Sequence, residues 1–170
     1  MKALCVFAAS ALLLVLATIS ASAQNANATL KNAEGKDVGG AALTQTPAGV
    51  LIKLSLKGVP AGEHAFHIHG VGKCEPPFMS AGGHFNPGKK KHGMMAPAGA
   101  HAGDMPNLHI PANGELVVEV LNAAVTLDKA KANSLFGREG TSLIIHAGKD
   151  DYKTDPTGEA GGRIACGVIE

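Results

Sequence analysis

Apolar and polar residues alternate most clearly between positions 50 and 56. Val50, Ile52, Leu54 and Leu56 are each separated by one residue, and the separating positions include a lysine and a serine. A period of two places alternate side chains on the same face of a β-strand. This segment is therefore predicted to be a strand with one buried face.

Shorter stretches with strand-forming residues are separated by clusters of turn residues. They predict strands at residues 29–32, 63–70, 116–121, 125–127, 141–146 and 164–169, a turn at 34–35 and a short helical turn within 128–135. Residues 71–111 show neither helical nor strand periodicity, and so long a run inside a compact domain is usually functional or disordered. Many short strands without alternating helices indicate an all-β sandwich or barrel with antiparallel, Greek-key-like connections.

The first 23 residues have the layout of a secretory signal peptide. Lys2 precedes an apolar run at 3–17, and small residues at 21–23 suit a signal peptidase, so cleavage is expected after Ala23. The alternative is a membrane-spanning helix, but the run is shorter than the roughly 20 residues that a bilayer requires and no charge cluster follows it. Residues 24–170 are expected to form one soluble, exported domain.

Composition narrows the function classes. The chain has 170 residues, of which 45% are hydrophobic and 17% charged, which suits a single domain with a buried core. The formal net charge of +1 falls to zero without Lys2, and no basic stripe is interleaved with aromatic residues. Nucleic-acid binding is therefore not expected. No second apolar run of membrane length follows, so stable membrane association is not expected either.

The cysteines agree with export. Cys5 lies in the predicted signal peptide, which leaves Cys74 and Cys166. An even pair in an oxidising compartment predicts one disulfide, with two buried thiols as the alternative. Closing so long a loop stabilises the fold by about 4–5 kcal/mol in the chain-entropy account.

All eight histidines fall between positions 64 and 146. Strand pleating places His67 and His69 on one face, opposite His64, and neighbours on one face are about 6.5–7 Å apart, close enough to share a metal ion. An exposed polar pair on a strand is the alternative. By the same alternation His146 is on the opposite face from Leu143 and Ile145, and it could join the pair.

The aperiodic stretch adds further candidate ligands. His84, His92, His101 and Asp104 supply three imidazoles and a carboxylate, which is a ligand set for four-coordinate zinc. A metal would also order a loop that has no core of its own. The alternative is a polar surface loop.

Six ordered segments of the chain together resemble the copper/zinc superoxide dismutase family. They are residues 62–69 (GEHAFHIH), 80–87 (SAGGHFNP), 91–93 (KHG), 101–104 (HAGD), 143–146 (LIIH) and 161–169 (GGRIACGVI). The resemblance covers essentially all of residues 24–170, and the stretch 72–77 (GKCEPP) looks most like the bacterial periplasmic branch. It implies an antiparallel eight-stranded Greek-key β-sandwich or barrel with long metal-binding loops.

The resemblance also implies two metal sites and the roles of neighbouring residues. Copper would be held by His67, His69, His84 and His146, and zinc by His84, His92, His101 and Asp104, so His84 would bridge the two. Asp150 matches a carboxylate that links the far nitrogens of His67 and His92, with an ordinary loop aspartate as the alternative. His64 matches a structural histidine that binds no metal, and His109 matches no family role, which favours a surface position.

The chemistry implied is the disproportionation of superoxide to O₂ and H₂O₂. Copper would cycle between Cu(II) and Cu(I), while zinc, which has no accessible second redox state, would fix the loop and His84. In the family the bridging histidine leaves copper on reduction and carries a proton. Arg163 matches the arginine that attracts and orients the anion, and a surface ion pair is its alternative.

The loop before Arg163 departs from the common family pattern. Glu159 places a negative charge where a small amide is usual, and Pro156 precedes Thr157 where a lysine is frequent. Lys149 and Lys153 are the candidates to replace that positive charge. These differences bear on the attraction of superoxide and leave the metal-ligand set complete.

Two other functions compete with the enzyme. A secreted copper- and zinc-binding module would be expected to lack part of the copper site, and a structural β-sandwich would not need the ligands. Both are disfavoured by the complete set of matching positions. The sequence does not separate a periplasmic from an extracellular location, or a monomer from a homodimer.

Overall fold

The computed structural model describes residues 24–170. The predicted signal peptide at residues 1–23 lies outside the described residues. Within 24–170 there are nine strands and one short 3₁₀ turn, η1. They are β1 (Asn25–Asn32), β2 (Asp37–Thr46), β3 (Gly49–Leu56), β4 (Gly62–His64), β5 (Phe66–His69), η1 (Met79–Ala81), β6 (Leu108–Ile110), β7 (Leu116–Asn122), β8 (Ser142–His146) and β9 (Arg163–Val168). In this part of the chain no helix is long and apolar enough to span a bilayer.

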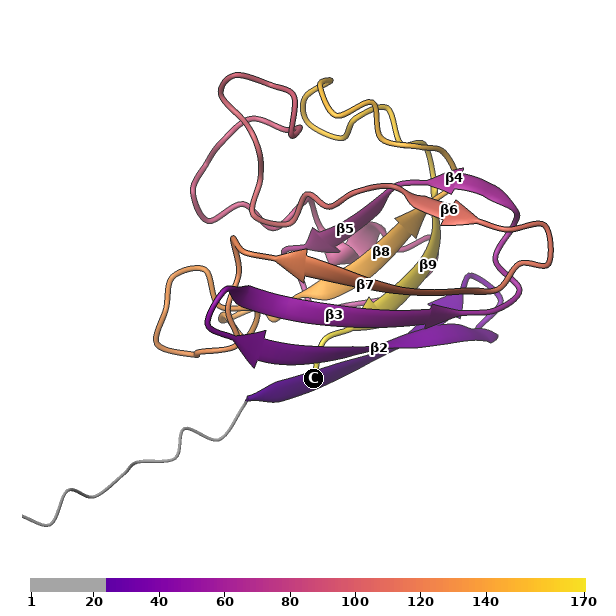
Figure 1. Ribbon diagram of the computed structural model, residues 1–170, viewed down its shortest axis with the longest axis horizontal. Coiled ribbons are helices and arrows are strands. Elements are labelled where there is room, and N and C mark those ends of the chain that lie inside the picture. Colours follow the sequence, from indigo (N-terminus) through magenta and orange to yellow (C-terminus); the bar gives the residue numbers. More distant parts are fainter. Residues whose placement is uncertain (1–23) are drawn as a thin grey trace, which may run out of the picture.

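Seven strands form one curled sheet, in the order β5-β8-β9-β1-β2-β3-β7, and β4 pairs with β6 in a small second sheet. Every strand pairing is antiparallel. The long loops after β5 and β8 leave from opposite ends of this antiparallel pair, and Figure 1 shows that both lie on the same side of the sheet, at the top of the view. The predicted all-β antiparallel fold is confirmed, and the loops that carry the candidate ligands are brought together.

The alternation predicted for residues 50–56 is confirmed in β3. Val50, Ile52 and Leu54 are fully buried and Leu56 is 3% exposed, all in the main core. Burying an apolar side chain of this size contributes about 1.5–3 kcal/mol relative to leaving it in water. This face of the sheet is therefore the main stabilising surface of the molecule.

The same alternation separates core from site in β5 and β8. Phe66, Ile68, Leu143 and Ile145 belong to the main core. His67 pairs with Ile144 across the two strands, so the histidines of β5 lie on the opposite face. Here Ile144 packs in a small second cluster with Phe78, Ala81 and Cys166. One face of these strands therefore fills the core, and the other supports the ligand-bearing loop.

Several predicted elements differ from the structure. Nine strands are present where eight were expected, because the strand predicted at 63–70 is interrupted at Ala65. The Ala65 N–H donates to the Gly148 carbonyl and its own carbonyl accepts from His146 N–H. The segment therefore changes partner here: β4 pairs with β6, and β5 pairs with β8.

Other differences arise from small or irregular residues. Strand β2 was missed because Gly39 and Gly40 interrupt its apolar pattern. A Cβ built at Gly39 would lie 2.1 Å from the Ser55 carbonyl oxygen, so glycine permits the close approach of β2 to β3. Residues 125–127 are not a strand, and 128–135 form turns rather than a helical turn. Strand β6 lies inside the stretch predicted to be irregular.

Candidate metal centre

Two groups of ligand atoms lie side by side between the sheet and the loops. Within each group the ligand atoms are within 4.8 Å of one another, and His84 belongs to both. The first group is His67, His69, His84 and His146; the second is His84, His92, His101 and Asp104. The structure thus brings together all seven of the residues that the sequence offered as metal ligands.

Strands β5 and β8 position most of the four-histidine group. The Nδ1 of His69 donates to the Gly82 carbonyl at 2.9 Å, and that of His146 to the Gly161 carbonyl at 3.2 Å. These bonds turn the two Nε2 atoms toward each other, 3.4 Å apart. His67 is oriented the other way, because its Nε2 donates to Asp150 Oδ2 at 2.8 Å and leaves Nδ1 facing the group.

The second group converges on one carboxylate oxygen. The Nδ1 atoms of His84, His92 and His101 lie 2.9, 3.1 and 3.3 Å from Asp104 Oδ1. The other oxygen of Asp104 accepts from the backbone N–H groups of Gly93 and His101. The chain therefore orients the carboxylate through its own loop, and three imidazole nitrogens face the same point.

Asp150 connects the two groups through ring nitrogens that do not face either group. Its Oδ2 accepts from His67 Nε2 and its Oδ1 from His92 Nε2, at 2.8 and 2.9 Å. The Asp150 side chain is 1% exposed. A Cβ at Gly158 would lie 1.9 Å from Asp150 Oδ1, so only a glycine leaves room for this contact. The carboxylate fixes one ring in each group at once.

Burial keeps three histidines of the first group, His67, His69 and His146, neutral. It lowers the pKa of His67 to about 4, against the opposing effect of the Asp150 hydrogen bond. Burial also lowers the pKa of His69 to about 2 and that of His146 to about 3. Neutral imidazole is the form that binds a metal, so the rings are held ready for one.

The two carboxyl groups are held ionised. Burial alone would raise the pKa of Asp104, but hydrogen bonds from His84 and the Gly93 N–H outweigh it and bring the pKa well below its usual range. The pKa of Asp150 is lowered in the same way, with hydrogen bonds from His67 and His92 outweighing burial. The centre therefore combines three imidazoles that burial keeps neutral with two charged carboxylates.

Two buried nitrogen atoms indicate that the centre is built for metal. Among the side chains of residues 24–170, the buried nitrogen or oxygen atoms without a hydrogen-bond partner are His67 Nδ1 and His84 Nε2. Leaving such groups unpaired costs about 1–3 kcal/mol each unless something binds them. Both belong to the four-histidine group, whose all-imidazole donors suit copper, while three imidazoles and a carboxylate suit zinc. The residues fit both metals.

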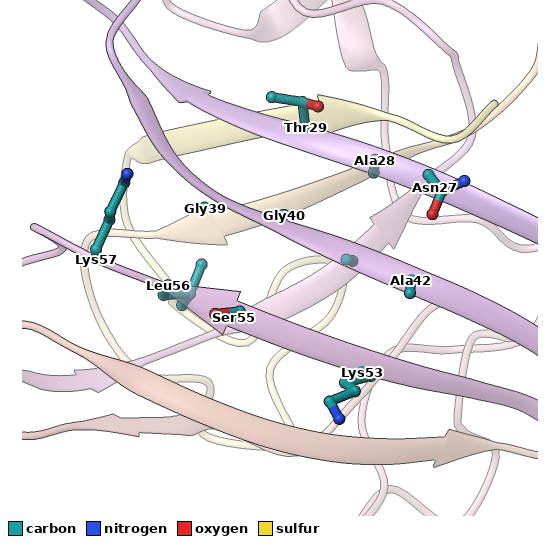
Figure 2. A pocket seen from close by; sticks show the side chains of 11 residues that line it. Asn27, Ala28, Thr29, Gly39, Gly40, Ala42, Lys53, Ser55, Leu56 and Lys57 are labelled. Carbon is teal, nitrogen blue, oxygen red and sulfur yellow. The ribbon is translucent and has the colours of Figure 1, made fainter.

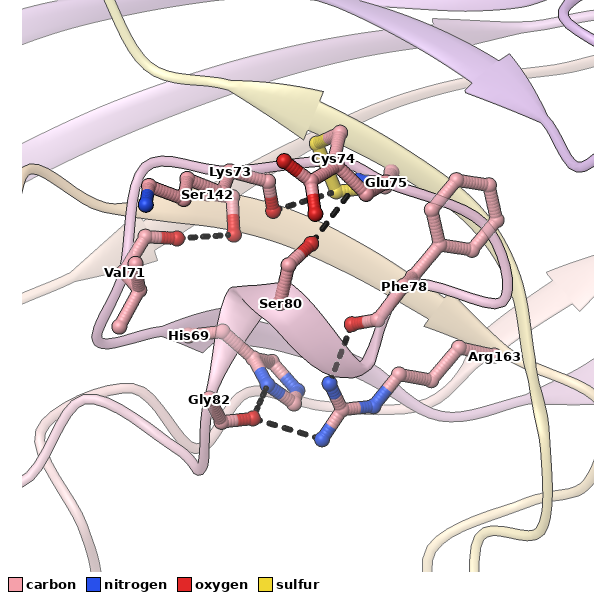
Figure 3. The surroundings of a disulfide bond; sticks show 11 residues. His69, Val71, Lys73, Cys74, Glu75, Phe78, Ser80, Gly82, Ser142 and Arg163 are labelled. Atoms are coloured by element: carbon pink, nitrogen blue, oxygen red, sulfur yellow. Dashed lines mark hydrogen bonds between the residues drawn. A yellow bond between two sulfur atoms is a disulfide. The ribbon is translucent and has the colours of Figure 1, made fainter.

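Arg163 lies beside the first group and is held by the loop after β5 (Figure 3). Its Nη1 donates to the Phe78 carbonyl at 2.5 Å and its Nη2 to the Gly82 carbonyl at 2.6 Å. The Gly82 carbonyl also accepts from His69 Nδ1, so one oxygen connects the guanidinium to a candidate ligand. Burial lowers the pKa of Arg163, but an arginine stays charged at any physiological pH.

The predicted Cys74–Cys166 disulfide is present and anchors the same loop (Figure 3). Cys166 lies in β9, three residues after Arg163, and Cys74 lies at the start of the loop. The Glu75 N–H donates to Ser80 Oγ at 2.9 Å, and Ser142 Oγ to the Val71 carbonyl at 2.9 Å. The loop that supplies the two carbonyls for Arg163 is therefore fixed at several points.

The remaining sequence candidates are located outside the two groups. The Nδ1 of His64 lies 2.8 Å from the His146 carbonyl oxygen and its Nε2 lies 2.9 Å from the Pro60 carbonyl oxygen, in agreement with a structural role. The His109 side chain is 74% exposed, as expected of a surface residue. Lys149 lies 3.5 Å from Glu63. Lys153 and Glu159 are exposed, and Glu159 adopts a φ of 55°.

Three residues that hold the centre were missed by the sequence analysis. Asp155 accepts from the His92 N–H at 2.8 Å and pairs with Lys91, while Asn107 and Tyr152 contact Asp150. Each joins segments that are far apart in the chain, and no local pattern marks them. That Tyr152 is the single tyrosine of the chain is the one signal that could have drawn attention to it.

A shallow depression elsewhere on the molecule is unrelated to these groups. It lies on the outer face of β1, β2 and β3 and is lined mainly by small side chains, with Lys53 and Lys57 at its border (Figure 2). No residue of either ligand group borders it. The metal centre is therefore identified by its chemistry and not by the size of a cavity.

Comparison with known proteins gives consistent matches. Residues 38–169 match the family described as copper/zinc superoxide dismutase. The chain is 58% identical to Cu-Zn superoxide dismutase 1 of Aquifex aeolicus over 146 residues, covering 85% of this chain and 86% of that protein. It is 42% identical to the Cu-Zn superoxide dismutase of Caulobacter vibrioides over 149 residues, covering 86% of each.

Solved structures show the same likeness. A superoxide dismutase-like protein from Bacillus subtilis superposes with a TM-score of 0.82 at 39% identity, over 85% of this chain and 97% of that one. The Cu/Zn superoxide dismutase from Brucella abortus superposes with a TM-score of 0.70 at 30% identity, over 86% of this chain and all of that one.

Proposed function

Because the chain belongs to the copper/zinc superoxide dismutase family, we propose that its two ligand groups are the copper and zinc sites of that enzyme. The protein is a superoxide dismutase: it converts two superoxide anions and two protons to O₂ and H₂O₂, with copper and zinc as cofactors. His67, His69, His84 and His146 hold copper, and His84, His92, His101 and Asp104 hold zinc.

The position of His84 carries this assignment. Its Nδ1 faces Asp104 in the zinc group, and its buried Nε2 has no partner in the protein. Two four-coordinate sites need eight donor atoms from seven residues, so one side chain must donate twice, and His84 is the residue present in both groups. One imidazole thus spans the two sites.

Copper, when bound, supplies the electron transfer by alternating between its two oxidation states, next to a zinc ion of fixed charge. His84 Nε2 is the atom that takes up a proton when it is not bound to metal and delivers it to the reduced substrate. Its Nδ1 stays oriented by the zinc group throughout. Asp150 keeps His67 and His92 from rotating, so the ring of His84 moves against a fixed frame.

Arg163 attracts and orients superoxide. A guanidinium beside the copper ligands gives a permanent positive charge at the site of an anionic substrate. Its bonds to the Phe78 and Gly82 carbonyls fix its direction without neutralising that charge. The disulfide holds the loop that provides these carbonyls, so it supports the orientation of Arg163.

Superoxide disproportionation by the mature protein, with copper and zinc counted, tests these roles. We expect one copper and one zinc per chain and rapid turnover. His146→Ala should lose copper and activity, and Arg163→Ala should keep both metals but react about tenfold more slowly at low salt. Metal-replete wild type no faster than free copper would instead indicate a secreted metal-binding module.

We also propose that the protein is exported to the periplasm as a soluble monomer or homodimer. The layout of residues 1–23 and the disulfide support export, since such bonds persist in oxidising compartments. Mass spectrometry of the protein from fractionated cells should find a chain that begins at Gln24 in the periplasmic fraction. An uncleaved chain in the cytoplasm would contradict this, and sedimentation would give the oligomeric state.

A further inference from the structure

Tyr152 joins the loop after β8 to both ends of the zinc-binding segment. Its hydroxyl oxygen accepts from the Asn107 N–H at 2.7 Å, three residues after Asp104. Its carbonyl oxygen accepts from the Met95 N–H at 3.1 Å, three residues after His92. One residue therefore contacts the backbone beside two zinc ligands, and neither contact involves a ligand atom.

Tyr152 also contacts the carboxylate that connects the two metal groups. Its N–H donates to Asp150 Oδ1 at 2.6 Å, the same oxygen that accepts from His92 Nε2. This bond and the hydroxyl bond come from opposite ends of one residue. The position of Tyr152 is thus coupled directly to the direction of the Asp150 carboxylate.

Asn107 completes the arrangement from the other side. Its side-chain amide donates to the Asp150 carbonyl at 2.9 Å and accepts from the Asp150 N–H at 2.8 Å. Its own N–H is the group bound by Tyr152. Asn107 therefore holds the backbone of Asp150, while Tyr152 holds the backbone of Asn107.

The backbone at Tyr152 adopts a conformation that a tyrosine rarely takes. Its φ is 63°, in the left-handed region where a side chain with a Cβ costs energy. The neighbouring segment is equally constrained, because a Cβ at Gly93 would lie 2.1 Å from the Tyr152 carbonyl oxygen. Such a conformation persists only where surrounding contacts fix it, and at Tyr152 those contacts surround the metal centre.

We infer that Tyr152 is a positioning residue for both metals, acting through Asn107 and Asp150. This inference rests on the proposed roles of Asp150 and the ligand set. Because the Asp150 carboxylate holds His67 of the copper group and His92 of the zinc group, loosening Tyr152 weakens the binding of both metals together. A residue that served only the zinc loop would affect zinc alone.

Tyr152→Phe tests this, because it removes the hydroxyl oxygen and keeps the ring and all backbone contacts. The metal-loaded protein is mixed with an excess of a colorimetric chelator, and the release rates of copper and zinc are measured separately. Partners that orient metal ligands typically change metal affinity about 10–100-fold. Tyr152 is one contact further from the metals than Asp150, so the effect of its substitution should be smaller. We expect Tyr152→Phe to release both metals about three- to tenfold faster than wild type, with a changed Cu(II) absorption spectrum.

Two further variants make the result specific. Asn86→Ala removes an amide that makes the same pair of backbone bonds, to Lys90 in the same loop, without contacting Asp150, and should leave both release rates unchanged. Asp150→Asn should release both metals faster than Tyr152→Phe does.

The outcomes distinguish a failure of the Tyr152 inference from a failure of the proposed role of Asp150. If Asp150→Asn accelerates release and Tyr152→Phe does not, the role of Tyr152 is overturned and that of Asp150 stands. Equal acceleration by Tyr152→Phe and Asn86→Ala, or a loss of thermal stability with unchanged release, also overturns it by showing a merely structural role. If Asp150→Asn releases metal at the wild-type rate, the proposed role of Asp150 has failed.

Discussion

The sheet and the metal loops of this protein are ordered by different forces. In β3, alternate apolar side chains are buried against the core, and main-chain bonds join the strand to β2 and β7. The loops at residues 71–107 and 147–162 contain little regular structure, and polar contacts hold them: histidine to aspartate, arginine to carbonyl, and one disulfide. The sheet is therefore specified by burial, and the loops by polar contacts and one disulfide, several of which involve the candidate metal ligands.

The largest contrast is expected when both metals are removed. The two loops should lose protection from amide hydrogen exchange, because three imidazoles and the Asp104 carboxylate lose the ions that they orient around, and Asp150 loses the fixed rings that it contacts, while β1, β2 and β3 stay protected. The melting temperature should fall markedly, since ligands that bind only the folded state stabilise it. Uniform loss of protection across the sheet would contradict the separation of the two regions.

The disulfide should give the next largest effect. Replacing Cys74 and Cys166 by serine removes a bridge across 92 residues, for which the chain-entropy account gives about 4–5 kcal/mol. Activity per bound copper should also fall, because Phe78 and Gly82 then hold Arg163 less firmly. Denaturant unfolding and copper-normalised activity measure the two effects. Unchanged activity per copper would show that the other loop contacts suffice to hold Arg163.

Within the sheet, Leu54→Ala should lower the free energy of unfolding by about 2–5 kcal/mol, as expected for a fully buried leucine. Leu51→Ala is its matched control, because Leu51 lies on the same strand with its side chain half-buried on the opposite face, and should cost clearly less. Urea titration of the metal-loaded proteins gives both values. Neither variant should change the copper or zinc release rate, since the two regions are stabilised independently.

The smallest effect is expected at Asp155, an exposed residue that contacts Lys91 and the backbone of His92. Lys91→Ala removes a surface ion pair with Asp155 and should leave zinc release unchanged, because such pairs contribute little in water. Asp155→Ala should accelerate zinc release slightly, since it also removes the acceptor of the His92 N–H. Chelator competition measures both, and equal rates for the two variants would assign no role to that hydrogen bond.

Parts of the molecule whose pattern is local were predicted well. The buried face of β3 and the opposition of His67 to Phe66 followed from strand pleating, and the disulfide followed from the two cysteines that remain outside the predicted signal peptide. Strand β2 was missed because its glycines carry no apolar signal, and the break at Ala65 was missed because the residue changes partner between two sheets. The alternation of apolar and polar residues along a strand indicates which of its faces is buried. It does not indicate which other strand pairs with it.

The sequence by itself determined the candidate chemistry of this protein: seven proposed ligand residues, Arg163 and one cysteine pair, because the identity of a donor atom is fixed by residue type. Only the tertiary structure decided which of them meet and what holds them. Tyr152, Asn107 and Asp155 act across 43 to 63 residues of chain, on the side of the sheet where the loops after β5 and β8 lie together. Contacts of that kind depend on the folding of the sheet, so no spacing in the sequence records them.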